Sequence, residues 1–90
     1  MALFPLGQVV ATPGALAVLQ KAEQEPREFL DRHVNGDWGD VSEDDKRENE
    51  DSIQHGFRMF SAYTTSAGDR IWIITEADRS ATTILLPDEY

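Results

Sequence analysis

The sequence predicts an α+β protein in which N-terminal helices pack on an antiparallel meander sheet of three to four strands. Residues 12–55 hold three stretches with helical spacing or helix-capping signals, whereas residues 57–86 hold three runs rich in aromatic and β-branched side chains. Short connections between those runs are typical of antiparallel neighbours. The chain has 90 residues, and a chain of this size buries only about 60–65% of its unfolded surface. We therefore expect one domain over residues 1–90.

The chain begins with a short strand or extended arm, expected over residues 6–11. Thr12 then precedes Pro13, a pair typical of a helix start, because the threonine hydroxyl caps the helix and the N–H that proline lacks has no partner there. This first helix is expected to reach about residue 23, with a stripe formed by Leu16, Leu19 and Ala22.

A second helix is expected from Pro26 to Val34. The residue before a proline is pushed out of the α region, so the first two helices are separated at residue 25. Asn35 and Gly36 provide a C-terminal stop. The side chains on one stripe of this helix are Phe29, Leu30, His33 and Val34. Trp38 lies in the linker that follows, and we expect it to fill the core beneath that linker.

The third helix is expected to begin after Ser42 and to end near His55, before Gly56. Ser42 is followed three residues later by Asp45, an arrangement that resembles a capping box. The acids of the first turn also suit the positive end of the helix dipole. Because Ile53 is almost its only apolar residue, we expect this helix to lie on the surface and to contact the core mainly at its ends.

The last third of the chain predicts a meander with strands over residues 57–65, 70–76 and 81–86. Gly68 is the position expected to take a positive φ in the first connection. The middle strand carries apolar side chains at odd and even positions alike, so we expect it to be central. Its second apolar face needs a cover, which the N-terminal arm or a partner chain in a homodimer would supply.

The strongest anomaly of the sequence is the acidic segment between Asp37 and Asp51. The chain carries 17 acidic and 8 basic residues, a formal charge of −9, and this segment alone holds eight acids and two bases. Such a charge disfavours direct binding to nucleic acid, which needs a basic surface. The candidate partner-binding residues are Asp37, Asp40, Glu43, Asp44, Asp45, Glu48 and Asp51.

Three interpretations of these acids are open. On a helix, Asp44, Glu48 and Asp51 share one face with neighbours about 5–6 Å apart, a spacing comparable to that of successive phosphates. The row therefore predicts a docking surface for a protein partner, such as a basic nucleic-acid-binding protein, or a nucleic-acid mimic that inhibits a host nuclease in anti-restriction or anti-CRISPR fashion. The plainest interpretation is a solvated outer face with a Glu43–Arg47 pair.

The sequence offers little that is typical of an active site. It contains no cysteine, nucleophile elbow, calcium loop, HExxH motif or phosphate-binding glycine loop. Its histidines are expected to be structural, His33 in the core and His55 at a helix end. Arg79 is expected to pair with a carboxylate such as Asp78 or Glu76. We therefore expect no catalytic residue, cofactor or metal site. A small metal-dependent hydrolase, the third hypothesis, needs a titratable group in a pocket.

No segment is typical of a targeting signal or a membrane helix. The first 19 residues are uncharged, but no lysine or arginine precedes their apolar part, and Gln8, Pro13 and Gly14 interrupt it. No stretch approaches the roughly 20 apolar residues that a membrane helix needs. A cytoplasmic location without membrane contact is the default expectation.

Three segments of the chain resemble a family of small bacterial proteins that are described as hypothetical or plasmid-related and sometimes labelled as a type I restriction subunit. The segments are IWIITEADRSATTILLPDEY, GQVVATPGAL and RHVNGDWGDV, which together extend over nearly the whole chain. The resemblance implies a bacterial origin and an association with mobile elements, and it carries over no catalytic residue. The leading hypothesis is a non-enzymatic acidic module that binds a protein, with homodimerisation as an open alternative for the sheet.

Overall fold

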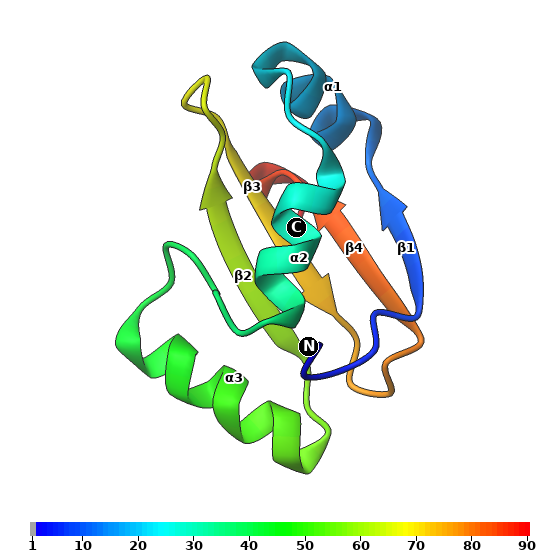
Figure 1. The fold of residues 1–90 in the computed structure, drawn as a ribbon, viewed down its shortest axis with the longest axis vertical. Helices are drawn as coiled ribbons and strands as arrows, with labels where there is room; N and C mark the ends of the chain where they lie inside the picture. Colours follow the sequence, from blue (N-terminus) through cyan, green and yellow to red (C-terminus); the bar gives the residue numbers. More distant parts are fainter. Residues whose placement is uncertain (1) are drawn as a thin grey trace.

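The structure, a computed structural model, describes residues 2–90 as helices packed against a four-stranded sheet, so the predicted α+β class is confirmed (Figure 1). The elements in chain order are β1 (Gln8–Ala11), α1 (Pro13–Ala22), α2 (Pro26–Val34), α3 (Glu43–His55), β2 (Met59–Thr64), β3 (Arg70–Thr75), β4 (Ala81–Leu85) and the short 3-10 helix η1 (Pro87–Glu89). In the described part of the chain no helix is long and apolar enough to cross a membrane.

The sheet is mixed, which corrects the prediction of a purely antiparallel one. Its strand order is β1-β4-β3-β2, and the predicted meander of β2, β3 and β4 is antiparallel with β3 in a central position. The N-terminal arm, however, joins the sheet as a parallel strand beside β4, with Gln8 opposite Ala81 and Ala11 opposite Ile84. Parallel pairing requires a long crossover, and the helices and meander between β1 and β4 supply it.

The predicted starts of α1 and α3 are confirmed by their caps, whereas α2 begins at Pro26 as predicted without a side-chain cap. The Thr12 side chain accepts a hydrogen bond from the Ala15 N–H, and that of Ser42 accepts one from the Asp45 N–H. The stripe predicted for α1 is partly wrong, because Leu16 is 48% exposed whereas Ala15 and Leu19 are buried. This helix has only ten residues, and its contact with the sheet follows the row of Ala15 and Leu19, one turn apart.

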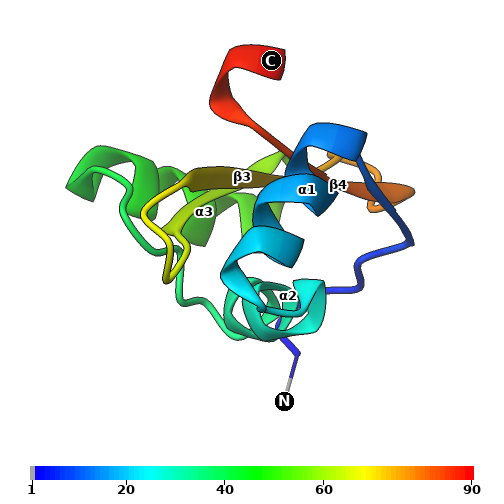
Figure 2. The ribbon, with the colours of Figure 1, turned by 90° about the horizontal axis from the view of Figure 1, so that it is seen from above.

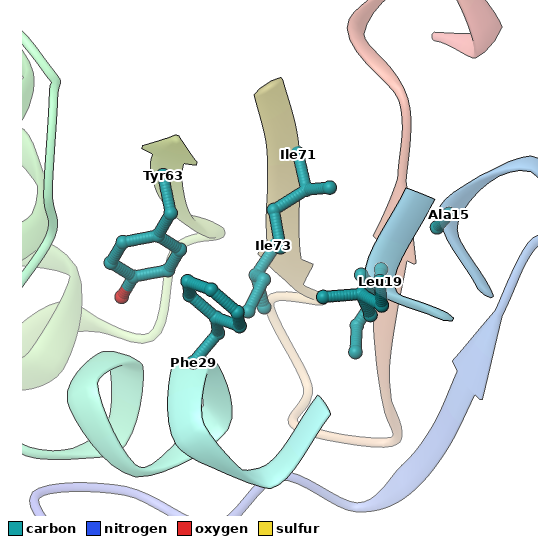
Figure 3. Close-up of a cluster of buried hydrophobic side chains, with 7 residues drawn as sticks. Ala15, Leu19, Phe29, Tyr63, Ile71 and Ile73 are labelled. Carbon is teal, nitrogen blue, oxygen red and sulfur yellow. The ribbon is translucent and has the colours of Figure 1, made fainter. Parts of the chain in front are cut away.

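Helices α1 and α2 cover one face of the sheet, and η1 lies on the opposite side from α2 (Figure 2). The odd-numbered side chains of β3 point toward these helices. Figure 3 shows Ile71 and Ile73 beside Phe29 of α2, Tyr63 of β2 and Leu19 of α1, all of them buried. This cluster accounts for most of the apolar core on the covered face, where burial of each aliphatic side chain stabilises the fold by about 1.5–3 kcal/mol.

Helix α3 lies along the outer edge of β2 and not over a face of the sheet (Figure 1). This surface position agrees with the prediction for α3, but the helix contacts β2 through Asn49 in mid-helix and not mainly at its ends. Its buried residues are Asn49 and Ser52, both polar, so the helix has no apolar stripe with which to cover strands. The second face of β3 is covered only in part: η1 contacts β3 there, Ile74 is buried and Trp72 is half-buried, and the N-terminal arm does not add a cover, because it extends the sheet as β1.

The linker before α3 closes the edge of β2. Trp38 is buried and stacks on Phe4, as expected of a side chain that fills the core beneath the linker. Its carbonyl accepts from the Ala62 N–H, and the Asp40 N–H donates to the Ala62 carbonyl. Gly39 between them has φ +74°, and a Cβ there would clash with the carbonyl oxygen of Ala62. Only glycine allows the linker to approach β2 this closely.

Candidate partner-binding groove

The face of the sheet opposite α1 and α2 forms, together with α3, a groove of about 670 Å³. We define the groove by an acidic wall on α3 and an apolar floor on β2 and β3. The wall carries Asp45, Glu48 and Asp51, and the floor carries Phe60, Trp72 and Ile74. Phe57, Arg58 and Tyr90 lie at its margins. A groove of this size is within the usual range of ligand-binding sites, about 300–1,000 Å³.

The aromatic rings of the floor, Phe60 and Trp72, are half-buried, whereas the rings at its margins are exposed. The rings of Phe60 and Trp72 are 4.9 Å apart and nearly perpendicular, and the ring of Tyr90 lies 5.7 Å from Trp72. Tyr90 is 68% exposed and Phe57 is 61% exposed. Edge-to-face pairs of this kind favour each other by about 0.5–1.5 kcal/mol beyond their buried area. The cluster is therefore ordered by its own contacts while it presents apolar surface to solvent.

The wall follows from the way α3 faces the sheet. Asn49 and Ser52 point inward, so Glu48 and Asp51, which immediately precede them, flank that inward side and face the groove. Asp45 begins the same wall one turn earlier, and its N–H is capped by Ser42. The structure thus brings three of the seven acids predicted from the sequence to one side of one cavity.

Two of the other predicted acids lie on the linker and do not line the groove. Asp37 accepts from the Nε of Arg32 at 2.7 Å, and this hydrogen bond holds the pKa of Asp37 below its ordinary value. The Arg32 guanidinium also lies 4.5 Å from the ring centre of Tyr63. Asp40 accepts from the hydroxyl of Thr64 at 3.0 Å. These contacts fasten the linker to α2 and β2.

The remaining two acids form ion pairs on the surface of α3. Lys46 pairs with Glu43 at 3.4 Å, and Arg47 pairs with Asp44 at 2.6 Å. The predicted Glu43–Arg47 pair is wrong, because both bases reach back three residues to the first turn. Exposed pairs of this kind contribute little stability, but they place positive charge beside Asp44. The predicted row of Asp44, Glu48 and Asp51 is therefore neutralised at its first member.

Asn49 fixes the distance between the wall and the floor. Its side-chain amide donates to the Phe60 carbonyl at 2.8 Å and its amide oxygen accepts from the Phe60 N–H at 3.0 Å. The side chain thus bonds to β2 as a neighbouring strand would. This role was not predicted from the sequence. The available signal was the position of an asparagine in mid-helix, where its side chain competes with helical structure.

Arg79 holds the far end of α3. Its guanidinium donates to the carbonyls of Ser52 and Phe57, both at 2.7 Å, and to that of Glu76 at 3.2 Å. The sequence predicted a carboxylate partner such as Asp78 or Glu76, and this is wrong. Backbone carbonyls at a helix end carry partial negative charge and accept readily from a guanidinium. The structural role predicted for Arg79 is thereby fulfilled through other partners.

The two histidines lie outside the groove's lining. His33 is fully buried, as predicted, between Ser61 on β2 and Thr75 on β3. Thr82 donates to the Leu6 carbonyl at 2.7 Å, so Thr75 must donate to Thr82 and accept from the Nε2–H of His33. The Nδ1 atom then accepts from Ser61 at 2.5 Å. This neutral form suits the site, because burial lowers the pKa of His33 to about 4.

His55 is the last residue of α3, and Gly56 follows in the left-handed conformation, as predicted. Among residues 2–90 no three histidine, aspartate or glutamate side chains are grouped so that they could hold a metal ion. The groove's own residues are the aromatic and acidic side chains described above. Its acids and the second apolar face of the central strand were both identified from the sequence, whereas the groove that the fold forms between them was not predicted.

Comparisons of the chain with protein-family models, with curated proteins and with solved structures returned no match. The resemblance to small plasmid-related bacterial proteins therefore stays a prediction. The functional conclusion depends on the geometry and charge of the groove itself.

Proposed function

We propose that the protein is a non-enzymatic binding module whose groove takes a segment of a partner protein carrying basic and apolar side chains. The observation that carries this proposal is the position of three carboxylates in the same groove as half-buried aromatic rings on the floor and exposed ones at the margins. Aromatic side chains in a partly enclosed site are the usual anchors of binding free energy. Carboxylates along the rim select the charge of the partner and accelerate its approach.

The charge balance of the groove favours a basic partner over a second copy of the chain. Asp45, Glu48 and Asp51 oppose a single cation of the lining, Arg58. The whole chain also has a formal charge of −9, and its field attracts basic molecules over several ångströms. A homodimer through this face would bring the acids of two copies together, and opposed like charges cost several kcal/mol in an interface. We place this activity in the cytoplasm.

The test is a peptide array of random dodecamers probed with the purified protein. We expect the bound peptides to be enriched in arginine or lysine next to apolar residues. The double variant Glu48→Gln/Asp51→Asn should weaken binding of the best peptide about tenfold or more at low salt. The matched control, Glu43→Gln/Glu50→Gln, removes the same charge from α3 outside the groove and should stay within about twofold. Equal losses in both variants, or bound peptides without basic enrichment, would refute the proposal.

Nucleic-acid mimicry is the second candidate function. It depends on the row of Asp44, Glu48 and Asp51 on α3, whereas the first candidate depends on the groove. A mimic presents regularly spaced charge to a phosphate-binding surface. Here Arg47 pairs with Asp44 at 2.6 Å and interrupts the row, which favours the groove. If the partner is a nucleic-acid-binding protein, competition between this protein and nucleic acid for that partner distinguishes the two candidate functions. A mimic must be displaced from its partner by DNA or RNA and must lose affinity when Asp44→Asn is introduced, whereas the groove predicts little effect of that change.

A further inference from the structure

A guanidinium already lies against the aromatic floor of the groove. The Cζ atom of Arg58 is 5.6 Å from the ring centre of Tyr90, and that ring in turn contacts Trp72. The ring of Phe60 lies 4.9 Å from that of Trp72. Phe60, Trp72, Tyr90 and the Arg58 guanidinium thus form an unbroken series of contacts. This arrangement shows what chemistry the outer end of the floor accepts.

Arg58 is held in that place weakly. Its ion pair with Glu76 has an N–O distance of 3.9 Å, and its side chain is 48% exposed. By contrast, Arg79 donates at 2.7 Å to two carbonyls and Arg32 donates at 2.7 Å to Asp37. An exposed cation–π contact contributes only about 0.5–1 kcal/mol. The Arg58 side chain can therefore leave Tyr90 at small cost, without disturbing a buried bond.

We propose that Arg58 is an internal stand-in for an arginine of the partner, which displaces it and stacks on Tyr90 within reach of the carboxylates of the acidic wall. This inference rests on the proposed function and specifies the partner's side chain. Arginine suits the site better than lysine, because a guanidinium is planar, weakly hydrated and stacks on aromatic rings. An incoming arginine is free to pair with Glu48 or Asp51, whereas Arg58 is paired with Glu76.

The proposal makes Arg58 a competitor of the ligand. A site that is free for only a fraction of the time binds its ligand more weakly by that fraction. For an exposed cation–π contact, removal of the competitor should tighten binding about three- to sixfold. Substitution of Arg58 should thus increase affinity, although most substitutions in a binding site reduce it. That direction separates displacement from a purely structural role of Arg58.

The experiment uses three nonapeptides with acetylated N-termini and amidated C-termini. Their central residue is arginine, lysine or citrulline, which is the neutral isostere of arginine. A leucine follows the central residue, and glycine and serine fill the other positions. Binding is followed by the NMR signal of the Trp72 indole N–H. The indole of Trp38, which is buried and does not line the groove, serves as an internal reference. The variants are Arg58→Gln and Tyr90→Ala, and Arg47→Gln is the control that removes the same charge from α3.

We expect the arginine peptide to shift the Trp72 signal and leave that of Trp38 unchanged. It should bind about three- to sixfold more tightly to Arg58→Gln, within about twofold of the parent to Arg47→Gln, and at least about threefold more weakly to Tyr90→Ala. The citrulline peptide should bind more weakly than the arginine peptide, and the affinity of the lysine peptide should lie between the two.

This inference is overturned if the arginine peptide binds Arg58→Gln with unchanged or weaker affinity, if the citrulline peptide binds as tightly as the arginine peptide, or if the arginine peptide does not bind at all. The response of array-selected peptides to Glu48→Gln/Asp51→Asn tests the proposed function independently.

Discussion

The two faces of the sheet differ in what their side chains do, although the same strands supply both. On the covered face, Ile71, Ile73 and Thr75 of β3 are fully buried beneath the helices. On the other face, Trp72 of the same strand is only half-buried, although Ile74 is buried, and both line a groove beside an acidic helix. Alternation along a strand makes this division possible, because neighbouring residues point to opposite sides. Side chains that pack under the helices thus alternate along one segment with side chains that line the groove.

Polar side chains are hydrogen-bonded to one another on the covered face of the sheet and exposed to solvent in the groove. Under the helices, the His33 ring and three hydroxyls form a continuous chain of hydrogen bonds that ends at the Leu6 carbonyl. In the groove, the carboxylates of Glu48 and Asp51 lie on the exposed side of α3 beside apolar rings. A buried polar group without a partner costs free energy, whereas an exposed carboxylate is solvated until a ligand arrives. The difference indicates which polar groups serve the fold and which are available to a partner.

The largest expected effect lies on the covered face. Ile73→Ala should lower the free energy of unfolding by about 4 kcal/mol, because it removes apolar contacts and leaves a cavity beneath the helices. Val10→Ala, at a position that is 43% exposed, should cost less than about 1 kcal/mol. Urea denaturation of the two variants provides the measurement. Similar losses for both would contradict the assignment of stability to the covered face.

The next effect is a pH dependence that comes from His33. The unfolded histidine titrates near pH 6.5, whereas burial lowers its pKa in the folded protein to about 4. As the pH falls from 7 to 4, the unfolded chain takes up a proton that the folded chain excludes, so the free energy of unfolding should fall by about 3 kcal/mol. Urea denaturation between pH 7 and 4 measures this loss. In His33→Asn, which is less stable at neutral pH, the slope across this window should be much smaller; an unchanged slope would assign it to other groups.

A smaller effect is expected at the boundary between the two regions. Asn49→Ala removes both hydrogen bonds to the Phe60 backbone and should cost about 2 kcal/mol. The amide of Phe60 should then exchange with deuterium faster than the amides of β3. Gln54→Ala, on the exposed side of α3, is the matched control and should have almost no effect. Retained protection of Phe60 in Asn49→Ala would show that α3 is held by other contacts.

The smallest effect on stability is expected at the groove's margin. Tyr90→Ala removes a ring that is 68% exposed and should change the free energy of unfolding by less than about 1 kcal/mol. Thermal unfolding followed by circular dichroism checks this value. A loss comparable to that of Ile73→Ala would mean that the aromatic floor belongs to the core, and the contrast between the two faces would fail.

Much of the local structure was predictable from the sequence, and the reasons are local. Thr12–Pro13 and Ser42 start helices through their own side chains, and Gly68 takes the positive φ that its turn requires. The parallel pairing of β1 was not predictable, because it depends on β4, which lies at the far end of the chain. The carbonyl partners of Arg79 were not predictable either, because every residue has a backbone carbonyl and the sequence does not indicate which of them accepts.

The candidate site was predictable in its charge and not in its shape. The acids of α3 were identified from their density, but only the fold shows that Asp45, Glu48 and Asp51 face the floor while Glu43 and Asp44 pair with lysine and arginine. The aromatic floor comes from β2, β3 and the segment after η1, which approach one another only in the folded chain. Long-range contacts of this kind are set by topology and not by local propensity.

The most direct test of the central claim is the amide hydrogen-exchange footprint of the best array-selected basic peptide on the intact protein. If the groove is the binding site, protection should increase at residues 45–52 of α3 and at residues 57–60, and it should stay unchanged in α1 and α2. Protection confined to α1, α2 or the outer edge of β1, with none beside the acidic wall, would contradict the account.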